Sequence, residues 1–170
     1  MEVPVHVWRV GRNDESIYLL ILQDEAGTPL WMTIGPCEAV AIWNAMRGEY
    51  GNAIAADPGS HDLLCDMISS LGGQLAKVVI DDFWNDVYFA KLHISVDSEM
   101  VTVDSRPSDA IAVALRLEAP LYVNDTVMEA VAHPTPQEES PSEEEEPPTQ
   151  DSDLWGDMDD TEEPGESNPA

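Results

Sequence analysis

The chain has 170 residues, enough for one folded domain and an appended segment, and it carries 34 acidic against 7 basic side chains. All seven Lys and Arg residues lie between Arg9 and Arg116, and no run of them forms a basic patch in the sequence. This excludes a strongly basic protein that binds nucleic acid or anionic membranes through long-range attraction.

Residues 133–170 contain fourteen acidic and no basic side chains, with few large apolar ones. Such a segment does not bury enough surface to offset its ordering entropy, about 1–2 kcal/mol per residue for the backbone, and so it predicts a disordered acidic tail. Leu154, Trp155 and Met158 form an apolar island that is either part of a solvating tail or a docking segment for a basic protein partner. The predicted organisation is therefore a domain over 1–132 and a tail over 133–170.

Two cysteines, Cys37 and Cys65, stand far apart and form no metal-binding or disulfide motif. Both lie in or beside apolar helical patterns, so we expect both to be buried. Neither a signal peptide nor an apolar run long enough to span a bilayer is present. We therefore expect a soluble, cytoplasmic protein with no membrane association.

The first third of the chain predicts an antiparallel meander of three strands. Val3–Val7 alternates, and Ile17–Leu22 is a nearly continuous apolar run, which is typical of a strand covered on both faces. Asp24–Thr28 turns the chain onto a third strand, Leu30–Ile34, which Gly35-Pro36 ends.

Two helices are predicted next, from apolar positions three and four residues apart. The first covers Glu38–Met46, and the second follows Ser60 as its N-cap and ends at Gly72-Gly73. The positions expected to face the core are Ala39, Ile42, Trp43, Met46, Leu63, Leu64, Met67, Ile68 and Leu71.

The rest of the domain predicts three strands, a third helix, a short strand and a last helical turn or two. Their ranges are Leu75–Ile80, Val87–Ile94, Met100–Val103, Pro107–Leu117, Leu121–Val123 and Asp125–Val131. Strands and helices are grouped rather than alternating. This predicts an α+β fold, with about three helices packed on a mostly antiparallel sheet, rather than a doubly wound parallel sheet.

The most polar element lies where the strand ending at Val103 meets the helix beginning at Pro107. Two carboxylates, two hydroxyls and a guanidinium fall within the six residues Asp104–Asp109. Strand-to-helix junctions bring side chains and free backbone N–H groups together, which suits anion binding and chemistry. Glu38 and the pair His61-Asp62 open the other two helices, and the three helix N-termini would form a polar pocket if they converged.

These polar groups also have a structural interpretation. An acidic side chain in the first helical turn stabilises the helix dipole by about 0.3–1 kcal/mol, so Glu38 and Asp109 are either caps or functional groups. Arg106 either binds a phosphate or pairs with Asp104 or Asp109 at the corner of the chain. Asp81-Asp82 is expected to be a solvated turn after a strand.

Exposed tryptophans are candidate platforms for stacking on nucleic-acid bases. The patterns place three of the four tryptophans of the domain, Trp8, Trp31 and Trp43, in the core. Only Trp84, in the predicted turn 83–85, is expected to be exposed.

A series of short segments, taken in chain order, resembles one known family. They are Trp31–Ala39, Ser60–Leu64, Val78–Asp82, Phe89–Leu92, Asp104–Ile111 and Ala119–Val123, and the Arg-Pro-Ser-Asp-Ala-Ile box at 106–111 is the most specific of them. This series is similar to the bifunctional nuclease family. The resemblance implies a compact α+β domain, a homo-oligomer, and deoxyribonuclease and ribonuclease activity. Residues 57–60 read Asp-Pro-Gly-Ser where the family usually has Arg-Pro-Leu-Thr, so a basic residue is missing there.

We therefore predict a nuclease that hydrolyses phosphodiester bonds in DNA or RNA with the help of Mg²⁺ or Mn²⁺. The predicted catalytic residues are Glu38, His61, Asp62, Asp104, Arg106 and Asp109. Among them Glu38, Asp104 and Asp109 would hold the metal or activate water. Arg106 would clamp the phosphate and His61 would transfer protons. Because residues 1–132 carry a net charge of −13, the metal is expected to bridge protein and phosphate. The alternative is a non-catalytic interaction module whose acidic surface and tail engage a basic protein.

Overall fold

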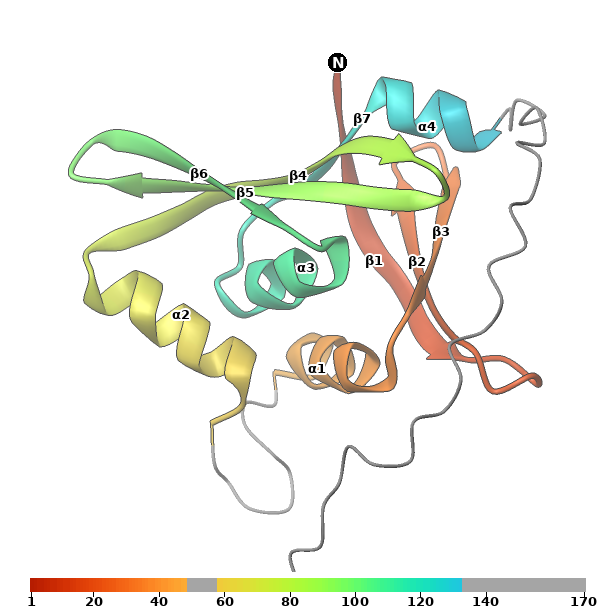
Figure 1. Cartoon of the computed structure of the whole chain (residues 1–170), viewed down its shortest axis with the longest axis horizontal. Coiled ribbons are helices and arrows are strands. Elements are labelled where there is room, and N and C mark those ends of the chain that lie inside the picture. The colour runs from red at the N-terminus through yellow and green to blue at the C-terminus, as the bar shows by residue number, and fades with distance from the viewer. Residues whose placement is uncertain (49–57, 133–170) are drawn as a thin grey trace, which may run out of the picture. The chain divides into compact units, whose positions relative to one another are not determined.

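A computed structural model describes residues 1–48 and 58–132 of the chain. The predicted tail 133–170, with its apolar island, lies outside the described residues, as does Asp57 of the segment that departs from the family pattern. Within the described part, seven strands form one mixed sheet and four helices pack on it (Figure 1). The predicted α+β class is confirmed.

The strand order in the sheet is β3-β2-β1-β7-β4-β5-β6. Only β4 and β7 run parallel, and the other neighbouring strands of the described sheet pair antiparallel. The strands are β1 (Glu2–Arg12), β2 (Tyr18–Asp24), β3 (Pro29–Ile34), β4 (Gly73–Trp84), β5 (Val87–Val96), β6 (Glu99–Ser105) and β7 (Leu121–Asn124). The predicted meander is thus confirmed as β1, β2 and β3, and Leu20, Ile21 and Leu22 of β2 are buried in succession as expected.

The helices are α1 (Pro36–Met46), α2 (Ser60–Ser70), α3 (Pro107–Arg116) and α4 (Asp125–Ala132). Helix α3 packs on β4 and β5 and also contacts α1 and α2, whereas α4 packs on β4 and β7, apart from the other three (Figure 1). The Ala-rich segment Ala110–Ala114 is fully buried because small side chains allow close approach on every side of α3. This burial holds the polar box at the start of α3 in a fixed place.

The predicted inward faces of the first two helices are partly wrong. Leu63 and Met67 of α2 are 57% and 50% exposed, and the buried side chains of this helix are Asp62 and Cys65. Leu64 and Leu71 are exposed too, and in α1 Trp43 and Met46 are exposed while Ala39, Ile42 and Ala45 are buried. The physical reason is that the contacts of α1 and α2 with α3 are made by the Ala41 carbonyl, Cys65 and the buried pair of Asp62 with Arg116, which leaves most of their other bulky apolar side chains, apart from Ile42, outside the core.

Three local predictions are also corrected. Strand β4 continues through Asp81 and Asp82 to Trp84, because Asn85 and Asp86 both have positive φ and form a tight two-residue hairpin turn. The N-cap of α2 is Gly59 rather than Ser60, and Cys37 is exposed whereas Cys65 is buried as predicted. No helix of the described segments combines the length and the apolarity needed to cross a bilayer.

Candidate functional site at three helix N-termini

Three helices begin close together, and each carries an acidic residue at its third position. These residues are Glu38 in α1, Asp62 in α2 and Asp109 in α3, which follow the N-caps Gly35, Gly59 and Arg106. Acidic side chains at this position complement the exposed N–H groups and the positive end of the helix. Sequence pattern alone accounts for the acids, but the packing of α1 and α2 against α3 is what brings them to one place.

A continuous chain of contacts links four of the six predicted site residues. Arg106 donates from Nε to Asp109 Oδ2 at 2.7 Å, and its Nη2 lies 3.0 Å from Glu38 Oε1. The other oxygen of Asp109, Oδ1, lies 3.0 Å from Nε2 of His61. We call this set, Glu38, Arg106, Asp109 and His61, the arginine cluster.

Arg106 is the member of the arginine cluster that is open to solvent. Its side chain is 69% exposed, against 16% for Glu38 and 26% for Asp109. Among the described residues nothing pairs with its Nη1, so N–H donors remain available there. A guanidinium fixed by two carboxylates and still exposed on one side is preorganised to bind an oxyanion.

The position of Glu38 depends on the absence of a side chain at Gly35. A Cβ atom placed on Gly35 would lie 2.3 Å from Glu38 Oε2, which is closer than any real contact. Only glycine lets this carboxylate fold back over the start of α1 while its other oxygen contacts Arg106.

Electrostatics keeps Asp109 ionised. Partial burial acts to raise its pKa, but the hydrogen bonds and charges of Arg106 and His61 outweigh burial and lower the pKa below its usual value. The same pairing raises the pKa of Arg106. Because the carboxylate is ionised at neutral pH and can only accept, Nε2 of His61 is the nitrogen that donates to it.

The lowered pKa of Asp109 has a consequence for stability. The stabilisation from its ionised form is fully present above the unfolded-state pKa of about 3.8 and is lost as the pH falls through the lower, folded-state value. We expect Asp109→Asn to unfold at a lower denaturant concentration than the wild type near neutral pH. The difference between the two midpoints should shrink as the pH falls below about 3.8. Denaturation curves at a series of pH values measure this. Asp66→Asn, an exposed site on α2, serves as the control, and a gap that does not change with pH would contradict the prediction.

The remaining two predicted site residues lie elsewhere. Asp62 is buried and accepts a hydrogen bond from Arg116 Nε at 2.6 Å and another from the Gly59 N–H at 2.7 Å. Arg116 also donates to the carbonyl oxygens of Ala41 and Ala112, so Asp62 belongs to a structural ion pair that joins α1, α2 and α3. The sequence signal for Arg116 was a charged residue in an otherwise apolar helix, which requires a buried partner.

Asp104 lies apart from the arginine cluster. It is exposed on β6, directly across from Lys91 of β5, whose pKa is raised by the hydrogen bond to Asp81 and also by the charge of Asp104. The side chain of Asp104 forms no hydrogen bond or ion pair with any residue that the structure describes. Lys91 itself pairs with Asp81. The end of the strand explains this placement: β6 ends at Ser105, and Arg106, as the N-cap of α3, no longer follows the alternation that would put it on the same face as Asp104.

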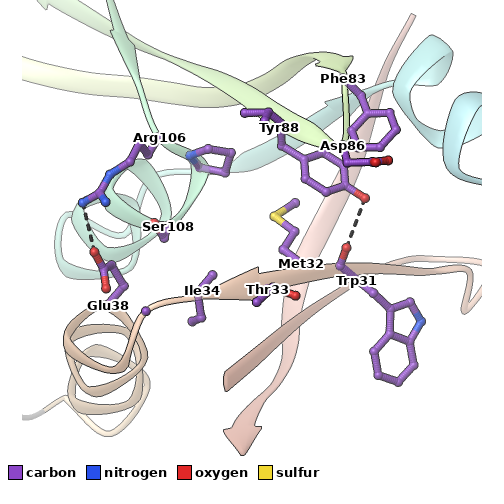
Figure 2. Close-up of a pocket in the computed structure, with 13 residues that line it drawn as sticks. Trp31, Met32, Thr33, Ile34, Glu38, Phe83, Asp86, Tyr88, Arg106 and Ser108 are labelled. Carbon is purple, nitrogen blue, oxygen red and sulfur yellow. Dashed lines mark hydrogen bonds and ion pairs between the residues drawn. The ribbon is translucent and has the colours of Figure 1, made fainter. Parts of the chain in front are cut away.

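A pocket of about 490 Å³ opens next to the arginine cluster, between β3, the β4–β5 hairpin and the starts of α1 and α3. Glu38 and Arg106 stand at one end of it and Phe83 and Tyr88 at the other (Figure 2). The rings of Phe83 and Tyr88 are 4.5 Å apart, and the Tyr88 hydroxyl donates to the Trp31 carbonyl at 3.1 Å. Burial raises the pKa of Tyr88, so this hydroxyl stays protonated. Neither residue was predicted for the site, because Phe83 falls in the predicted turn 83–85 and Tyr88 in the predicted strand Val87–Ile94, and neither carries a charge or a motif.

The arginine cluster does not present a ready metal site. In the described ranges no group of three or more His, Cys, Asp and Glu side chains is placed to hold a metal ion. The Arg106 guanidinium occupies the space between the carboxylates of Glu38 and Asp109, where a cation would have to sit. The residues therefore do not fit Mg²⁺ or Mn²⁺ in this arrangement, and metal dependence stays a prediction.

Removal of Arg106 should change metal binding in a defined direction. Arg106→Ala frees two carboxylates and leaves His61 beside them, so we expect this variant to bind Mn²⁺ more tightly than the wild type. Isothermal titration of both proteins with Mn²⁺ measures the difference, with Lys77→Ala as a control that breaks a remote exposed pair with Glu2. Equal Mn²⁺ affinity in the wild type and Arg106→Ala would show that the carboxylates of the arginine cluster are not metal ligands.

The family model and several named relatives agree on one protein family. The family model of the bifunctional nuclease domain matches residues 20–136. An uncharacterized protein of Mycobacterium tuberculosis strain H37Rv is 34% identical over 113 residues, which are 65% of this chain and 63% of that protein. Bifunctional nuclease 2 of Arabidopsis thaliana is 31% identical over 108 residues, 62% of this chain and 32% of its own. A bifunctional nuclease of Oryza minuta is 25% identical over 134 residues, 75% of this chain and 40% of its own.

In each of these comparisons the match spans less than two thirds of the relative's own length. The family match, by contrast, extends over more than half of this chain and contains all four residues of the arginine cluster. The chain therefore belongs to the bifunctional nuclease domain family.

Proposed function

We propose that this protein is a nuclease that hydrolyses phosphodiester bonds in DNA or RNA at the pocket beside the arginine cluster. The observation that carries the proposal is the exposed guanidinium of Arg106, which two carboxylates hold at the mouth of that pocket. The relatives named bifunctional nuclease support nucleic acid as the substrate class.

The proposed roles follow from which groups border the pocket. Arg106 would bind the nonbridging phosphate oxygens and stabilise the negative charge that grows on them in the transition state. Glu38 borders the pocket, and its Oε2 is the oxygen that Arg106 does not contact. This oxygen would act as the general base toward an attacking water.

In the proposed step, the water oxygen forms a bond to phosphorus while Glu38 Oε2 takes its proton. The bond between phosphorus and the ester oxygen breaks, and the leaving alkoxide takes a proton from solvent. Asp109 and His61 are not among the residues that line the pocket. We assign them as positioning residues, because Asp109 anchors the guanidinium and His61 donates to Asp109.

The proposal is tested with purified full-length protein on single- and double-stranded DNA and RNA, in EDTA and with Mg²⁺ or Mn²⁺. We expect Glu38→Gln to lower the hydrolysis rate about 100-fold, because the amide cannot accept the proton of water. Gly35→Ala should lower it as well, since the added methyl group displaces the Glu38 carboxylate without removing it.

The matched control is Glu129→Gln, which makes the same chemical change at an exposed site on α4 that does not line the pocket. It should keep wild-type activity. Hydrolysis that is unchanged in both Glu38→Gln and Gly35→Ala would identify a contaminating nuclease and remove the proposed site.

A further inference from the structure

A second hollow of about 500 Å³ lies between β1 and α1, and its chemistry differs from that of the arginine cluster. We define this basic groove by Trp8, Arg9 and Arg12 of β1 with Val40, Trp43 and Met46 of α1. Helix α1 lies beside β1 where β1 has lost its partner on that side (Figure 1), since β7 pairs only with Glu2–Val5. No carboxylate is among the described residues that line the groove.

The aromatic side chains of the groove contradict the prediction from the sequence. Trp8 and Trp43, expected in the core, are 52% and 49% exposed. Trp31 is exposed as well, and Trp84 is exposed as predicted. Trp8 sits at the bulge of β1, where the register with β2 shifts between Val7 and Arg9, and this bulge turns its indole out of the sheet.

The basic side chains of this acidic domain are distributed unevenly. Four of the seven, Lys77, Lys91, Arg106 and Arg116, are paired with carboxylates elsewhere. Arg9 and Arg12 form no ion pair with any residue of 1–48 or 58–132, and both are exposed at the groove. Arg47 lies over the Trp43 ring, with its Cζ 5.9 Å from the centroid. Arg9 and Arg12 therefore line the same groove as two exposed indoles, those of Trp8 and Trp43.

We infer that the basic groove binds single-stranded nucleic acid and holds the substrate of the nuclease. Arginines that neutralise phosphates, beside aromatic faces on which unpaired bases stack, are the recurring features of single-strand binding sites. A duplex hides its base faces and would bring many more phosphates against the acidic remainder of the domain. The substrate assignment rests on the proposed function, but binding itself can be measured without hydrolysis.

The groove and the arginine cluster share one helix. Glu38 lies in the first turn of α1 and Met46 at its end, which separates them by about 12 Å along the helix axis at about 1.5 Å per residue. A strand held in the groove is therefore within reach of Arg106 over a few nucleotides.

The test is the anisotropy of a fluorescein-labelled single-stranded oligo(dT) titrated with the full chain in EDTA. The measurement is made in the Arg106→Ala background, so that cleavage does not interfere. We expect Trp43→Ala and Trp8→Ala each to weaken binding about fivefold or more, and Trp43→Phe to retain most of it. The double variant Arg9→Gln/Arg12→Gln should reduce the slope of log K against log salt by about 1.4.

Two variants serve as matched controls. Trp84→Ala removes an exposed indole on the β4–β5 hairpin, and Lys77→Gln removes a cation outside the groove. Both should bind like the parent protein. If the groove variants match these controls while the wild type still hydrolyses nucleic acid, this inference is wrong and the proposed function stands.

If binding depends on the groove but no hydrolysis occurs, the proposed function fails and the binding site stands. A probe peptide rich in Glu, Leu and Trp tests whether the groove binds a protein partner instead of nucleic acid. If that peptide binds with the same dependence on Trp43 and the arginines while oligo(dT) does not, the groove is a protein-docking site and the inference is overturned.

Discussion

Arg106→Ala is expected to lower the rate of phosphodiester hydrolysis by about 100- to 1000-fold, the range seen when one donor to a developing oxyanion is removed. The guanidinium is the exposed cation at the mouth of the pocket, and Glu38 and Asp109 hold it in place before substrate arrives. Its loss removes charge stabilisation and leaves two carboxylates to repel the phosphate. Single-turnover assays with excess protein measure the chemical step directly.

Arg106→Lys tests whether the charge of Arg106 alone is sufficient for activity. A lysine keeps the positive charge but cannot contact Glu38 and Asp109 in the same forked geometry, so we expect activity between those of Arg106→Ala and the wild type. The unfolding midpoint serves as a check, because Arg106 is largely exposed and its removal should leave the fold intact. Wild-type activity in Arg106→Ala would exclude the arginine cluster as the catalytic site.

Arg116→Met is expected to lower the free energy of unfolding by about 3–5 kcal/mol, which is the largest stability effect that we predict. Arg116 and Asp62 are both buried, and Arg116 also satisfies two backbone carbonyls, of Ala41 and Ala112. Without the guanidinium, the carboxylate of Asp62 stays buried beside those carbonyls. Urea denaturation of each variant gives the change in the free energy of unfolding.

The double variant Asp62→Leu/Arg116→Met distinguishes two contributions to the free energy of unfolding. One is the destabilisation caused by a single unpaired buried charge, and the other is the net contribution of the intact ion pair. We expect it to recover much of the lost stability, since two apolar side chains leave no uncompensated charge. Lys77→Met, which breaks the exposed pair with Glu2, should cost less than about 1 kcal/mol. If Arg116→Met proves as mild as Lys77→Met, the ion pair does not hold the three helices together.

The secondary structure was largely predictable from the sequence because it depends on local patterns. Alternation and apolar runs located β1, β2 and β3, and Pro107 marked the start of α3 within one residue of its N-cap. Strand ends were less predictable. The turn at Asn85-Asp86 extends β4 through Asp81 and Asp82, which the composition alone had suggested to be a solvated turn.

The direction of side chains on α1 and α2 was not predictable, because it depends on what lies opposite each helix. Helix α3 presents small side chains and Arg116, and the contacts of α1 and α2 with it are made by the Ala41 carbonyl, Cys65 and Asp62. Apolar spacing indicates which face of a helix is hydrophobic, but it does not show whether another element covers that face. For this reason Trp43 and Leu63, expected in the core, are exposed.

The sequence by itself determined the family, the α+β class and the residue types of the candidate site, since these depend on composition, periodicity and the motif at 106–111. Only the tertiary structure decided which acids meet. It joined Glu38 and Asp109 to Arg106 and His61 to Asp109, turned Asp62 toward Arg116 and left Asp104 on an exposed strand. It also collected arginines and tryptophans from β1 and α1 in one groove. The physical reason is that contacts between residues far apart in the chain are set by the packing of whole elements, which local patterns do not encode.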